Sequence, residues 1–130
     1  MPETTPHPMA KSVLLVEDDR DIRESLIELL DGEGYLTIAV ENGRDALAHL
    51  ARIRPCLIIA DYLMPDMNGT DLVKAVQGQE TLRDIPILIL TAASKHMMGG
   101  DVTVPVLTKP VTIAALLAVL REHCGIRSAA

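Results

Sequence analysis

Short apolar runs alternate along the chain with segments that have helical periodicity. The runs cover residues 13–16, 36–40, 56–60, 85–90 and 104–107. The third run is apolar at every position, which is typical of a strand that is buried on both faces of a parallel sheet. The fifth run contains Pro105, and a proline cannot donate to a strand ladder, so this run should lie at a sheet edge. The runs therefore predict five strands.

Apolar stripes between the runs predict helices. In the first stripe, leucines and an isoleucine recur at i, i+4, i+7 and i+8, which places them on one helix face, and glycines follow it. Asn42 and Thr112 are suitable N-caps for the second and last helices. Residues 91–101 show little periodicity and contain Gly99 and Gly100, so any fourth helix there should be short. The stripe residues are Ile22, Leu26, Leu29 and Leu30; Ala46, Leu47, Leu50 and Ala51; Leu72, Val73 and Val76; and Ile113, Leu116, Leu117 and Leu120.

Five repeats of a strand followed by a helix predict an α/β fold: a doubly wound, five-stranded parallel sheet with right-handed crossovers. The length of 130 residues suits one domain. We expect a flexible leader over residues 1–10, the domain over 11–124 and a tail over 125–130.

Composition and charge exclude some classes of binding partner. The formal net charge is −6 and aromatic residues make up 2% of the chain, which argues against nucleic acid or an anionic membrane surface as a partner. No apolar run reaches the roughly 18 residues that span a bilayer. Cys56 and Cys124 lack metal-ligand spacing, and Cys56 is expected to be a buried small side chain. A reducing cytoplasm is the simplest inference.

Polar residues follow four of the strands. They are Glu17, Asp18 and Asp19 after the first, Asp61 after the third, Thr91 after the fourth and Lys109 after the fifth. Because the carboxyl ends of parallel strands share one edge, these side chains should converge there. Clustered carboxylates repel one another unless a hard cation such as Mg²⁺ lies among them. A cation, an ammonium and a hydroxyl around a nucleophilic carboxylate suit a phosphoryl group, which gives an aspartyl phosphate.

Each residue also has an ordinary structural interpretation. The acidic run could complement a helix dipole, Asp61 could begin a turn, Thr91 could be a loop hydroxyl and Lys109 could be a solvated surface charge. The joint pattern favours the site, because all four groups follow separate strands.

Four stretches of the sequence carry a resemblance to a known family. They are VLLVEDDRDIRESL at 13–26, IIADYLMPDMNG at 58–69, ILILTA at 87–92 and VLTKPV at 106–111. Over residues 11–123 the chain resembles the receiver domains of bacterial two-component response regulators. The resemblance implies a flavodoxin-like fold with strand order 2-1-3-4-5.

The resemblance also implies roles for individual residues. Asp61 would be the phosphoacceptor. Mg²⁺ would be held directly by Asp18, through water by Glu17, and by the backbone carbonyl of Leu63. Thr91 would be the switch hydroxyl and Lys109 would contact the phosphoryl oxygens. Pro110 would follow a cis peptide bond, and Met64, Pro65 and Gly69 would shape the loop.

The chain departs from the family pattern at two places. Val106 stands where many relatives have Tyr or Phe, and Thr91 lies only 18 residues before Lys109, so the fourth helix should be shortened. Because Val106 is short and stiff, we expect the glycine-containing segment between residues 92 and 104 to move on phosphorylation.

The resulting hypothesis is a single-domain response regulator in a two-component phosphorelay. A histidine kinase or phosphotransfer protein would be the phosphodonor, and an unknown protein target would receive the output. The chain would catalyse only its own phosphorylation and slow dephosphorylation. One alternative is a receiver-like binding module that does not need phosphate. Another is an aspartyl-nucleophile phosphohydrolase, but such enzymes usually carry an acid two residues after the nucleophile, where this chain has Leu63.

Overall fold

The computed structural model describes residues 11–64, 66–92 and 103–125. Its strands are β1 (Ser12–Val16), β2 (Leu36–Val40), β3 (Leu57–Asp61), β4 (Ile87–Thr91) and β5 (Val106–Thr108). All neighbouring strands pair in parallel, in the order β2-β1-β3-β4-β5. The α/β fold class and the strand order expected from the sequence are confirmed.

Within the described residues, four helices connect or follow these strands. They are α1 (Arg20–Gly32), α2 (Gly43–Leu50), α3 (Gly69–Gln77) and α4 (Ile113–Cys124). Asn42 caps α2 by accepting from the Asp45 N–H, and Thr112 caps α4 by accepting from the Ala115 N–H, so both sequence-based cap predictions are confirmed. The expected short fourth helix and the loop glycines lie outside the described residues, as do the leader and most of the tail.

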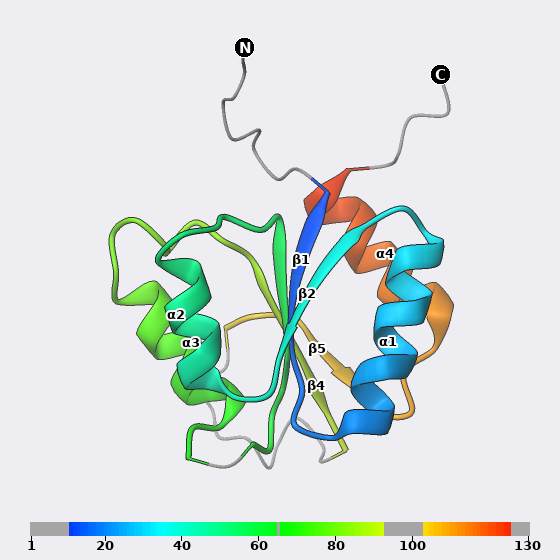
Figure 1. Cartoon of the computed structure of the whole chain (residues 1–130), viewed down its shortest axis with the longest axis horizontal. Helices are drawn as coiled ribbons and strands as arrows, with labels where there is room; N and C mark the ends of the chain where they lie inside the picture. Colours follow the sequence, from blue (N-terminus) through cyan, green and yellow to red (C-terminus); the bar gives the residue numbers. More distant parts are fainter. Residues whose placement is uncertain (1–10, 65, 93–102, 126–130) are drawn as a thin grey trace.

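The molecule has three layers, with the sheet between two pairs of helices. Figure 1 shows α2 and α3 on one side of the sheet and α1 and α4 on the other. Every residue of β1, β3 and β4 is buried, because helices cover both faces. The edge strand β5 is only partly buried, and Pro105 lies just before it. The prediction that this strand lies at an edge is confirmed.

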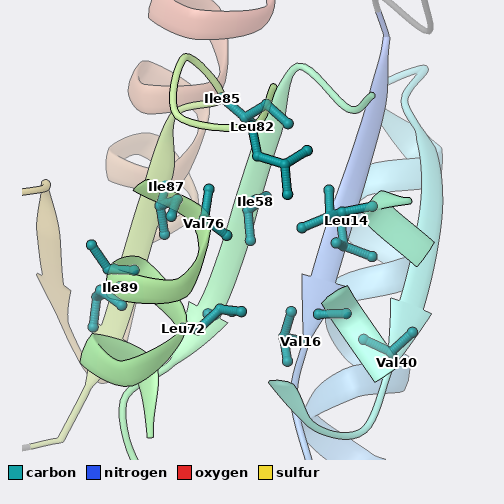
Figure 2. Packing of buried hydrophobic residues seen from close by; sticks show 14 residues of the cluster. Leu14, Val16, Val40, Ile58, Leu72, Val76, Leu82, Ile85, Ile87 and Ile89 are labelled. Carbon is teal, nitrogen blue, oxygen red and sulfur yellow. The ribbon is translucent and has the colours of Figure 1, made fainter. Parts of the chain in front are cut away.

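Two aliphatic clusters fill the spaces between the layers. One lies under α2 and α3 and contains Leu14, Ile58, Leu72 and Ile89 (Figure 2). The other lies under α1 and α4 and contains Leu30, Leu116 and Leu120. The helices contribute most of the apolar stripe residues that the sequence indicated, and the alternation of side chains along each strand supplies both clusters at once. Three predicted stripe residues are exposed instead: Ile22, Ala51 and Ile113.

One residue expectation was wrong. Cys56, expected to be a buried small side chain, is half-buried and forms a disulfide with Cys124 at the end of α4. The two residues are 68 positions apart in sequence, so their proximity depends on how α4 lies against the sheet. Spacing along the chain could not show it.

Gly69 provides a test of how closely α3 approaches β3. Its N–H donates to the carbonyl of Tyr62 at 2.7 Å, and a Cβ there would lie 2.8 Å from Ile89 Cδ1 and 3.0 Å from the Asp61 carbonyl oxygen. We predict that Gly69→Ala lowers the free energy of unfolding by about 1–3 kcal/mol through overpacking, measured by urea denaturation.

Gly32→Ala is the matched control, because a Cβ at Gly32 meets nothing within 4 Å. We expect this variant to be neutral or stabilised by up to about 1 kcal/mol. Equal effects of the two substitutions would contradict the close approach at Gly69.

Candidate functional site

Backbone hydrogen bonds align the carboxyl ends of the strands. The Tyr62 N–H donates to the Leu90 carbonyl at 2.8 Å, and the Lys109 N–H donates to the Thr91 carbonyl at 2.7 Å. The parallel ladder therefore continues one residue past β3 and past β5. This places Asp61 and Thr91, the last residues of β3 and β4, and Lys109, which follows β5, at the carboxyl ends of the strands. The sequence predicted this convergence.

Three carboxylates meet at this edge. Glu17, Asp18 and Asp61 each place one oxygen so that all three atoms lie within 4.8 Å of one another. Glu17 is 1% exposed and Asp61 is 8% exposed, whereas Asp18 is open to solvent. Two carboxylates of the cluster are therefore buried, and the third is accessible to solvent.

Lys109 supplies the positive charge in contact with this cluster. Its Nζ lies 2.7 Å from Asp61 Oδ1 and 3.7 Å from Glu17 Oε1. The first contact is a charge-assisted hydrogen bond, while the second is longer than a hydrogen bond. One ammonium therefore contacts two of the three carboxylates, and the cluster keeps an excess of negative charge.

Burial and charge shift two of these groups. Burial raises the pKa of the Glu17 carboxyl above its ordinary value; the hydrogen bond from the Asp19 N–H opposes this shift and the charge of Asp61 adds to it. Burial alone would lower the pKa of Lys109, but the hydrogen bond to Asp61 and the charges of Asp61 and Glu17 raise it overall. Lys109 is therefore held in its charged form.

The two oxygens of Glu17 have different surroundings. Oε2 accepts from the Asp19 N–H at 3.1 Å, whereas Oε1 is buried and has no hydrogen-bond partner among the described residues. A buried acceptor without a partner costs free energy that a ligand can recover. Clustered carboxylate oxygens are the donors that a hard divalent cation such as Mg²⁺ prefers, so the residues fit that ion.

Arg23 also belongs to the site, although sequence reasoning missed it. From α1, its Nη1 donates to the Glu17 carbonyl at 2.9 Å and lies 3.4 Å from the Asp18 carbonyl. These contacts hold the backbone of the loop that presents both carboxylates. Hydrophobic periodicity carries no signal for such a contact, since Arg23 lies beside the apolar stripe.

The remaining predicted site residues lie around the cluster. Thr91 is 1% exposed at the end of β4, and Leu63 is 65% exposed, two positions past Asp61. Asp19 has a structural role, because its side chain accepts from the Ile22 N–H at 3.0 Å and caps α1. The Lys109–Pro110 peptide bond is cis, as the resemblance implied.

A family model described as "Response regulator receiver domain" matches residues 13–121. The chain belongs to this family. A relative, the response regulator MprA of Mycolicibacterium vanbaalenii, is 37% identical over 117 residues, which are 87% of this chain and 50% of MprA. This chain thus spans about half the length of MprA. The polar-differentiation response regulator DivK of Brucella anthropi is 28% identical, over 90% of this chain and 98% of DivK.

Solved structures agree with the family assignment. The chemotaxis protein CheY4 of Vibrio cholerae superposes with a TM-score of 0.77 at 35% identity, covering 86% of this chain and 97% of CheY4. The receiver domain of the sensor histidine kinase PA1611 from Pseudomonas aeruginosa superposes with a TM-score of 0.75 at 28% identity, covering 88% and 98% of the two chains. That structure holds a magnesium ion in its active-site cleft.

The different surroundings of the two adjacent aspartates yield a prediction. Asp18→Asn should weaken Mg²⁺ binding at least about tenfold, because Asp18 is in the carboxylate cluster. Asp19→Asn should leave the affinity nearly unchanged, since asparagine also caps a helix, and Glu17→Gln should lie between them. Titration of each variant with Mg²⁺ gives the order. Greater sensitivity at Asp19 would contradict the assignment of Asp18 to the cation site.

The raised pKa of Glu17 predicts that the stability of the metal-free protein, measured with a chelator present, depends on pH. Because its pKa is raised from 4.5, the folded protein binds this proton more tightly than the unfolded chain does. The contribution of Glu17 to stability therefore falls as pH rises from 4.5 through the folded pKa. Glu17→Gln removes this contribution, so the stability of the variant relative to wild type should increase with pH.

Urea unfolding of both proteins with EDTA, at a series of pH values above 4.5, measures this difference. If the stability of Glu17→Gln relative to wild type stays constant or falls as pH rises, burial does not raise the pKa of Glu17 in the folded protein.

Proposed function

We propose that this receiver domain accepts a phosphoryl group on Asp61 in a two-component phosphorelay. A histidine kinase or phosphotransfer protein is the proposed donor, and an unidentified protein is the target. The observation that carries the proposal is that Asp61 contacts the ammonium of Lys109 at 2.7 Å and shares one carboxylate cluster with Glu17 and Asp18. Such an arrangement suits the transfer of an anionic group to a carboxylate.

In the proposed reaction, a carboxylate oxygen of Asp61 attacks phosphorus. An oxygen–phosphorus bond forms, the phosphorus–nitrogen bond of the donor phosphohistidine breaks, and its electron pair returns to the imidazole. No proton has to leave Asp61, because a carboxylate is already the nucleophile. Positioning and electrostatics therefore supply the catalysis.

Lys109 would move from a partner of Asp61 to a partner of the new phosphoryl oxygens. The contact with Asp61 raises the pKa of Lys109, so the lysine is charged when the phosphoryl group arrives. Asp18, Asp61, the Leu63 carbonyl and Glu17 through water would hold Mg²⁺, and the bound ion would offset the charge of the transferred group. The buried Glu17 Oε1 without a hydrogen-bond partner supports this assignment.

Thr91 is the proposed switch residue. It ends β4, next to β5, and its carbonyl accepts from the Lys109 N–H, so it is linked through the backbone to a group that would contact phosphate. Val106 packs, partly buried, against the cluster under α2 and α3. A short β-branched side chain has little rotamer freedom, so the transmitted movement would come from backbone beyond Thr91.

The site is proposed to work in the cytoplasm, without nucleic acid or a membrane as a partner. No helix in the part of the chain that the structure describes is long and apolar enough to cross a membrane. The negative formal charge supports a protein partner over a polyanion. Beyond its own phosphorylation and slow dephosphorylation, no catalytic activity is proposed.

Small-molecule phosphorylation tests the proposal. The protein is incubated with acetyl phosphate, with Mg²⁺ or with EDTA, and its intact mass is measured. We expect one phosphoryl group in Mg²⁺, little in EDTA and none on Asp61→Asn. Asp66→Asn is the matched control, because Asp66 is an exposed carboxylate on the same loop and should be phosphorylated like wild type.

Two outcomes would reject the proposal. One is equal phosphorylation of Asp61→Asn and wild type. The other is failure of folded, Mg²⁺-binding wild type to take up phosphate, which would favour the binding module that works without phosphorylation.

A further inference from the structure

The disulfide lies at the amino ends of the strands, opposite the carboxylate site at their carboxyl ends. Cys56 directly precedes β3 and Cys124 is the last residue of α4, and their Cα atoms are 5.2 Å apart. In Figure 1, α4 ends near the start of β1, away from the carboxyl ends of the strands. The bond therefore fastens the end of α4 to the sheet. The chain contains no other cysteine.

The two cysteine residues differ in exposure. Cys124 is 9% exposed and belongs to the aliphatic cluster under α1 and α4, whereas Cys56 is half-buried and packs at the margin of that cluster. We therefore expect a reagent in solvent to reach Cys56 more easily than Cys124. Because access helps decide which sulfur reacts in thiol–disulfide exchange, this difference assigns Cys56 as the cysteine that reacts first and Cys124 as the resolving cysteine.

The surroundings also suit the reduced state. Cys56 Sγ lies 3.1 Å from the carbonyl oxygen of Ser12, so a thiol at this position has an acceptor for its proton. Cys124 would stay within an apolar cluster, where a free cysteine packs as a small hydrophobic side chain. The packing of Leu116 and Leu120 holds most of α4 without the bond.

We propose that Cys56 and Cys124 form a reversible redox site that controls how firmly the end of α4 is attached to the sheet. A low-molecular-weight disulfide is the proposed oxidant. The Cys56 thiolate attacks it and releases one small thiol, and the Cys124 thiolate then attacks Cys56 Sγ and releases the second. Two cysteine thiols are oxidised, one small disulfide is reduced to two thiols, and the two protons pass to these thiols. Reduction runs the same steps backward.

This inference does not depend on phosphotransfer. The bond closes a loop from residue 56 to residue 124, with a sequence separation of 68, which contains β3, β4, β5 and the residues that end them. Closing a long loop restricts the unfolded chain, so oxidation should stabilise the whole domain. Disulfides in reducing compartments are usually transient or sensing, which agrees with a reversible site in a protein proposed to work in the cytoplasm.

Thiol trapping of the full chain tests reversibility. The folded protein is equilibrated in glutathione buffers that range from fully reduced to mostly oxidised. Free thiols are then alkylated, and the intact mass is measured. We expect two alkyl groups at the reducing end and none at the oxidising end, in a monomer, with the same midpoint from both directions. Cys124→Ser should instead retain one glutathione on Cys56.

Three results would overturn the proposal. They are two alkyl groups at every buffer ratio, a bond that reducing buffer opens only after denaturation, and a bond between two chains.

Thermal unfolding and hydrogen exchange test the tether. We expect the oxidised protein to melt about 10 °C or more above the reduced protein, and its amides at the end of α4 to exchange more slowly. Cys56→Ser is the matched variant, because its side chain is half-buried; it should behave like the reduced protein in both buffers. Equal melting temperatures and equal exchange in α4 for the oxidised and reduced proteins would show that the disulfide does not fasten the end of α4 to the sheet.

Discussion

The hydrogen-bonded ion pair between Lys109 and Asp61 connects the central strand of the sheet to its edge strand. The ammonium and the carboxylate are 2.7 Å apart, and Asp61 is 8% exposed. A buried carboxylate is costly unless it is paired, so β3 can end in Asp61 because β5 brings Lys109 to it. Glu17 adds a second buried carboxylate from β1, and Lys109 reaches it only at 3.7 Å. The site is therefore short of positive charge, and this deficit is the physical reason to expect a cation.

The rest of the fold fixes these groups in place. Parallel pairing aligns three strand ends, and the aliphatic clusters on both faces make the sheet a rigid base for short polar side chains. The contact from Arg23 to the Glu17 carbonyl, at 2.9 Å, adds a polar restraint on the one loop that carries two of the three carboxylates. Rigid support matters because electrostatic stabilisation of a transferred group requires charges that are already in position.

Much of this arrangement could be predicted from the sequence. Continuous apolar runs gave the buried strands, and polar residues directly after those runs gave the convergence of Glu17, Asp61 and Lys109, because strand ends are a property of topology. Other features depend on contacts that topology does not specify. Hydrophobic periodicity does not distinguish Asp18, which belongs to the cluster, from Asp19, which caps α1. The pairing of the cysteines was missed because it depends on where α4 ends against the sheet.

A divalent cation should complete the carboxylate cluster, and anomalous scattering from crystals grown with Mn²⁺ would locate it. Mn²⁺ is chosen because it shares the preference of Mg²⁺ for oxygen ligands. We expect one strong anomalous peak in contact with the carboxylates of Asp18 and Asp61, with Lys109 still beside Asp61. Crystals that bind Mn²⁺ elsewhere on the protein but show no peak at this cluster would contradict it.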